Sequence, residues 1–154
     1  MAYQMKYFMK NILVAIALVI SVTDSYAQAS QVFKTDNGAI GGFDPVAYFK
    51  EGKPVVGLKE NAVEWNGANW YFSSKENKES FEKNPERYAP QYGGYCAFGT
   101  AEGHKAPTQP DAWSIVDNKL YLNYNKKVQS DWKKDQTGYI KMADINWPAV
   151  KDSN

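Results

Sequence analysis

Two hairpin signals constrain the fold of this chain more than any other feature. The dipeptide Asn66-Gly67 separates two runs rich in apolar and aromatic residues, 62–65 and 69–72. Asn and Gly both tolerate the positive φ that a two-residue hairpin turn requires. A second pair of alternating runs, over 113–124, flanks Asp117-Asn118. The sequence therefore predicts two antiparallel β-hairpins.

Short helices are predicted around the two hairpins. Asp44 before Pro45 has the pattern of an N-cap followed by the first helical residue. The run 73–76, Ser-Ser-Lys-Glu, resembles a capping box that opens a helix through about Lys83. The remaining helices are expected over 92–101, over 125–134 and from 139 to near Pro148. This pattern predicts an α+β fold, with small antiparallel β-hairpins packed with several short helices in a single domain.

The first 27 residues have the pattern of an export signal. Lys6 and Lys10 precede an uncharged apolar stretch over 12–20, and residues 25–27 place small side chains at the −3 and −1 positions of a cleavage site. The apolar stretch is shorter than the about 20 residues needed to span a bilayer. We therefore predict a signal peptide over 1–27, a surface arm over 28–40 and the folded domain with a C-terminal helical extension over 41–150. The expected location is periplasmic or secreted, with no membrane association after cleavage.

Charge and cysteine content exclude several classes of protein. Without Lys6, Lys10 and Asp24, the 18 basic and 17 acidic side chains of the chain become 16 of each. Such a balance gives no attraction to nucleic acid or to an anionic membrane surface. The single cysteine cannot form an internal disulfide. The abundant aromatic residues are expected to stabilise the domain as its core, in place of a disulfide. They would also suit a ligand cleft.

Cys96 and His104 are the only cysteine and the only histidine, and they are the candidate metal ligands. Sulfur and imidazole are the donors that soft and borderline metal ions prefer. In an unbroken helix the two residues would lie about 12 Å apart along the axis, too far to share one ion. Gly99 and Gly103 are places where the helix can end and turn His104 back toward Cys96. Alternatively, Cys96 is a small buried apolar residue and His104 a solvated loop residue.

From Asp44 onward the chain resembles the YHS domain family, in its longer exported bacterial form. The resemblance covers roughly residues 41–150. The matching motifs are Asp44-Pro45-Val46, Tyr71-Phe72-Ser73-Ser74, Phe81, Pro85, Tyr88, Tyr92-Gly93-Gly94-Tyr95-Cys96, the run 119–126 and Asn146-Trp147-Pro148. The resemblance implies a hairpin followed by a helix, together with an association with metal handling.

The metal-associated members of the family carry cysteines where this chain has Ala47, Ser73 and Asn77. None of these three side chains is a soft thiolate ligand. The family's usual metal site therefore cannot be carried over. Cys96 and His104 would have to form a different site in the extension.

The sequence leads to a ranked set of functional hypotheses. The first is an exported, non-enzymatic binding protein for a soft transition metal such as copper, held by Cys96 either alone or together with His104. Cu(I) suits a site with few donors better than tetrahedral zinc does. The alternative is an interaction module whose aromatic surface binds a protein or an apolar ligand, with a structural Cys96. A thiol-dependent enzyme ranks last, because no residue at motif spacing orients His104 as a base for Cys96.

Overall fold

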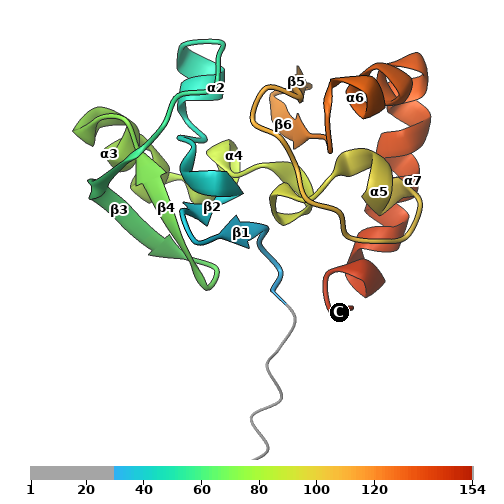
Figure 1. Cartoon of the computed structure of the whole chain (residues 1–154), viewed down its shortest axis with the longest axis horizontal. Helices are drawn as coiled ribbons and strands as arrows, with labels where there is room; N and C mark the ends of the chain where they lie inside the picture. The colour runs from blue at the N-terminus through green and yellow to red at the C-terminus, as the bar shows by residue number, and fades with distance from the viewer. Residues whose placement is uncertain (1–29, 154) are drawn as a thin grey trace, which may run out of the picture.

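The computed structural model describes residues 30–153, and the predicted signal peptide over 1–27 lies outside this range. The arrangement of hairpins and short helices in Figure 1 confirms the predicted α+β class. One half holds the strands and helices before residue 92, and the other holds the last hairpin and the C-terminal helices (Figure 1).

Within residues 30–153, each of the three sheets is an antiparallel pair of strands. The pairs are β1 (Lys34–Thr35) with β2 (Gly38–Ala39), β3 (Leu58–Trp65) with β4 (Ala68–Phe72), and β5 (Trp113–Val116) with β6 (Lys119–Leu122). Both predicted hairpins are confirmed. Their turns have positive φ at both central residues, 50° and 71° at Asn66-Gly67 and 49° and 59° at Asp117-Asn118. This is the conformation that the twist of the flanking strands favours.

The helices are short except for the last. The α-helices are α2 (Ala47–Lys50), α3 (Lys75–Lys83), α4 (Pro85–Tyr88), α5 (Ala97–Ala101), α6 (Lys126–Trp132) and α7 (Gln136–Val150), and the 3-10 turns are η1 (Ile40–Gly42), η2 (Gln91–Gly94) and η3 (Lys133–Asp135). No helix within residues 30–153 combines the length and the apolar character needed to cross a membrane.

Local capping explains where most of these helices begin. The side chain of Ser74 accepts a hydrogen bond from the Asn77 amide at 3.1 Å, so the N-cap of α3 lies one residue later than the predicted capping box of Ser73 and Glu76. Helix α7 runs past the predicted end near Pro148 to Val150. Pro148 removes only one helical donor, and the bond from Lys151 N to Trp147 O at 2.8 Å continues the pattern beyond it.

The helix predicted over 92–101 is interrupted. Tyr92 and Gly93 adopt positive φ within η2, and α5 begins only at Ala97. Gly93 is required there because a Cβ would overlap the carbonyl oxygen of Gln31. The carbonyl of Gly93 accepts from Phe33 N at 2.9 Å, so residues 30–33 are fastened across this turn.

Two adjoining hydrophobic cores hold the fold together, and β6 contributes to both. Leu120 and Leu122 face the first core with Trp70, Phe72 and Phe81. Tyr121, between them in sequence, faces the second core with Tyr92, Ala97, Ala101, Trp132 and Ala143. Successive strand residues point to opposite sides, so β6 forms the wall between the two cores.

The segment expected as a surface arm is partly internal. Val32, Ala39 and Ile40 are buried in the first core, and residues 34–39 form the β1–β2 hairpin. The many polar residues of this segment gave no indication of these three anchors.

Candidate functional site around Cys96 and His104

Cys96 is the N-cap of α5, and its sulfur is enclosed by hydrogen bonds. The residue is 2% exposed. Its Sγ accepts from the amide of Gly99 at 3.5 Å and from the amide of Tyr124 at 3.3 Å, and it donates to Asn123 Oδ1 at 3.6 Å. The thiol therefore has a partner for its proton and two for its lone pairs.

This environment keeps the thiol protonated. Burial raises the pKa of Cys96, and the amides of Gly99, Tyr124 and Phe98 offset part of that rise. A thiolate is the reactive form in nucleophilic chemistry. The environment of Cys96 consequently lacks the activation that a catalytic cysteine needs.

His104 lies on the turn after α5, and its side chain is exposed. Helix α5 ends at Ala101, Gly103 has a φ of +87°, and His104 N donates to Gly99 O at 3.0 Å. The imidazole Nε2 lies 3.2 Å from the position that a Cβ on Gly99 would occupy. The turn at Gly103 thus folds His104 back against Gly99 of α5.

Gly99 is the residue that both the Cys96 sulfur and the His104 imidazole approach. Its amide donates to Cys96, and its missing side chain leaves room for His104. The chemistry of this donor set is narrow. Within residues 30–153 no group of three or more His, Cys, Asp and Glu side chains is placed to hold a metal ion. Two donors suit Cu(I), which accepts low coordination numbers and prefers soft ligands, and they do not complete a tetrahedral zinc site.

Asn123 is a buried residue of this neighbourhood that the sequence analysis missed. Its Oδ1 accepts from the Phe98 amide at 3.2 Å as well as from the Cys96 thiol. Its backbone N and O bond to Ala112 and Gln109, which holds the loop over 105–112 near α5. The Nδ2 donor of Asn123 has no partner among the described residues. A single asparagine at the end of a strand carries no sequence signal for such a role.

The three positions to which the family resemblance assigns cysteines lie around the carboxylate of Asp44. This side chain is fully buried. Its Oδ1 accepts from the amides of Val46 and Ala47 at 2.8 and 3.2 Å. Its Oδ2 accepts from Ser73 N at 2.9 Å, Ser73 Oγ at 2.7 Å and Asn77 Nδ2 at 2.8 Å. A hydrogen-bond network therefore fills the place to which the family resemblance assigns thiolates.

Comparison with known proteins finds one family model that matches part of the chain. The family model described as YHS domain matches residues 46–92. The match contains Ala47, Ser73 and Asn77 and ends before Cys96 and His104. No curated protein and no solved structure matches the chain.

Proposed function

We propose that this chain, which contains a YHS domain over residues 46–92, is a non-enzymatic binding protein for Cu(I) held between Cys96 and His104. The YHS family is associated with metal binding, which supports a metal-related role in general terms. The proposal for this particular pair is carried by one observation: both side chains contact Gly99. The Cys96 sulfur accepts a hydrogen bond from its amide, and the His104 imidazole lies where its side chain would be.

The turn after α5 supports the pairing of the two ligands. Because Gly99 has no side chain, the Nε2 of His104 approaches the same turn of α5 in which the Gly99 amide donates to the Cys96 sulfur. Metal uptake requires the sulfur to exchange its hydrogen bonds for a metal bond and to lose its proton. Coordination to a soft cation lowers the pKa of a thiol, so the bound ion itself would favour deprotonation of Cys96, which the metal-free environment does not.

The proposed location is outside the cytoplasm. It rests on the export pattern of residues 1–27, with its basic start, apolar stretch and small residues at the cleavage position.

An anaerobic Cu(I) titration against a colorimetric chelator tests the metal proposal. The parent protein should withdraw one equivalent of Cu(I) from the chelator, and Cys96→Ser should withdraw none. His104→Asn should weaken the competition by about 10-fold or more, since it leaves a single donor. Gly99→Ala keeps both ligands but adds a methyl group 3.2 Å from Nε2, so it should also weaken binding. Equal competition by the parent and Cys96→Ser would reject the proposal.

The burial of Cys96 favours a second candidate, an interaction module in which the thiol is structural. An exposure of 2% and three hydrogen bonds are what a packed cysteine would have. In that case the titration finds no Cu(I) binding, and Cys96→Ser changes only the free energy of unfolding. The raised pKa of the thiol disfavours the third hypothesis, a thiol-dependent enzyme.

A further inference from the structure

A groove between β5 and α6 has a charge pattern that the metal proposal does not use. The open groove has a volume of about 410 Å³, with Trp113, Ser114 and Ile115 on the strand side. Gln129 fixes the two sides together, because its Nε2 donates to Trp113 O and, at 3.1 Å, to Ser114 Oγ. Gln129 is 4% exposed, so this connection is internal and the groove has a fixed width.

Two lysines line the helix side of this groove. Lys126, Gln129 and Lys133 are spaced i, i+3 and i+7, which places them on one helical face. Seven residues of helix separate the backbones of the two lysines by about 10 Å. Both lysines are exposed, and neither forms an ion pair with a carboxylate of residues 30–153.

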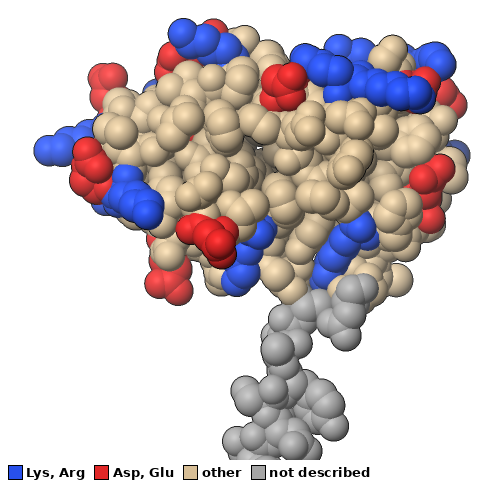
Figure 2. Space-filling view, in the orientation of Figure 1, with Lys and Arg blue, Asp and Glu red and all other residues tan. Residues whose placement is uncertain are grey.

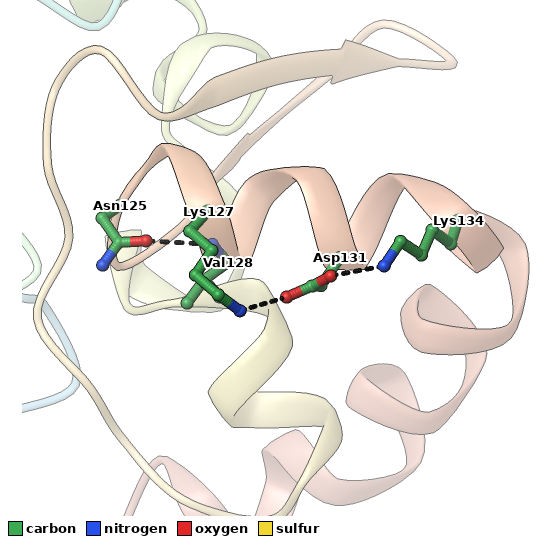
Figure 3. Close-up of polar contacts among 5 residues, drawn as sticks. All are labelled: Asn125, Lys127, Val128, Asp131 and Lys134. Atoms are coloured by element: carbon green, nitrogen blue, oxygen red, sulfur yellow. Dashed lines mark hydrogen bonds and ion pairs between the residues drawn. The ribbon is translucent and has the colours of Figure 1, made fainter.

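The two neighbouring lysines of the same segment, Lys127 and Lys134, share one carboxylate. Asp131 pairs with Lys127 at 3.0 Å and with Lys134 at 2.6 Å, as Figure 3 shows. In the space-filling view, Lys and Arg side chains gather over the part of the surface where α6 lies (Figures 1 and 2). Within the segment 126–134, the lysines without a carboxylate partner are therefore Lys126 and Lys133, both on the groove.

We infer that this groove binds an acidic, extended polypeptide segment of a partner protein. Carboxylates of the segment pair with Lys126 and Lys133, and the side chain of Ile115, 36% exposed, provides apolar contact between them. An extended chain rises about 3.3 Å per residue, so three to four residues span the distance between the two lysines. Strand β5 pairs only with β6 among the described residues, and recognition along a strand edge is a common mode of peptide binding.

The shape of the site favours a peptide over an anionic membrane. A membrane-binding face needs a broad apolar surface beside its basic residues. Here the exposed lysines lie along an open groove, and Ile115 is the one groove residue of residues 30–153 among the exposed large hydrophobic side chains.

Fluorescence anisotropy of a labelled octaglutamate peptide, at low salt and without metal, tests this inference. The double variant Lys126→Gln/Lys133→Gln should raise the Kd about fivefold or more, since each exposed ion pair contributes modestly. The matched control Lys127→Gln/Lys134→Gln removes the same charge from the same segment but not from the groove. It should change the Kd by less than about twofold. Octaglutamine should not bind.

Three results would overturn the inference. The first is failure of octaglutamate to bind the parent protein, and the second is an equal loss in both double variants, which would mean that only net charge matters. The third is stronger binding to phosphatidylglycerol vesicles than to the peptide with the same dependence on Lys126 and Lys133, which would assign the groove to a membrane surface. Circular dichroism of both variants confirms that these exposed substitutions leave the fold intact.

Discussion

Asp44 is the residue on which the YHS-matching part of the chain converges. Its buried carboxylate accepts five hydrogen bonds, from the start of α2, from Ser73 and from Asn77. Burying a carboxylate is unfavourable unless hydrogen-bond donors replace its water shell, and these five donors replace it here. The sequence predicted the two local bonds as a helix cap. The other three donors lie 29 and 33 residues away, so no local pattern could reveal them.

We expect Asp44→Asn to lower the free energy of unfolding by about 3 kcal/mol. The new amide presents a donor to groups that are themselves donors, and a bond to a charged acceptor is worth about 1.5–3 kcal/mol. Urea unfolding followed by tryptophan fluorescence measures the change. Asp36→Asn is the control, because Asp36 is exposed and its substitution should cost no more than about 0.5 kcal/mol. Equal stabilities of the two variants would show that the network contributes little.

The candidate site was predictable to a similar extent. Cys96 and His104 stand out as single occurrences, and of the two glycines that could turn the chain, the turn lies at Gly103 while Gly99 stays inside α5. The bonds from the sulfur to Asn123 and Tyr124 join residues 27 and 28 positions apart, and sequence spacing does not encode such contacts. Whether the pair holds a metal remains the prediction that the Cu(I) titration tests.

At the scale of elements, local chemistry determined what could be predicted. The two hairpins and helix α3 follow from turn and capping residues within four positions of one another. The break before α5 cannot be predicted from local residues. Gly93 is required there because the backbone of Gln31, more than sixty residues earlier in the chain, lies against it. Helix α6 belongs to the first group, since Asn125 Oδ1 accepts from the Val128 amide at 2.9 Å (Figure 3).

Asn125→Ala should lower the free energy of unfolding by about 1 kcal/mol. The substitution leaves an amide of the first turn without its capping acceptor, and alanine is among the poorest N-caps. Thermal unfolding followed by circular dichroism detects the change as a lower Tm. Lys127→Gln in the same turn is the control and should stay within about 0.5 kcal/mol of the parent. A cap that contributes nothing would give both variants the parent Tm.

At the scale of the whole molecule, buried tyrosines tie stability to alkaline pH. Burial, together with the charges of Asp144 and Asp117, raises the pKa of Tyr121 to about 12. Burial also raises the pKa of Tyr48 and of Tyr92, whose hydroxyl donates to Asp144 at 2.9 Å. The unfolded chain then loses these protons near the ordinary tyrosine pKa of about 10, while the folded protein keeps them.

The free energy of unfolding should therefore be fully present below pH 10 and should fall as pH rises from about 10 toward 12. Urea unfolding at several pH values in this window measures the slope. Tyr121→Phe should make the slope shallower, because one of the shifted groups is gone. A slope that is flat up to pH 12, or unchanged in Tyr121→Phe, would contradict this account.

The alternating side chains of β6 determine which changes in chain length the protein can accept. Leu120 and Leu122 pack in the first core, whose other members come largely from before residue 90. Tyr121 packs in the second core. Inserting or deleting a single residue in β6 would turn the side chains that face the first core toward the second core, and the reverse. Cutting the chain after residue 92 would remove Leu120 and Leu122 from the first core, so we expect the family-matching portion to fold only together with the C-terminal half.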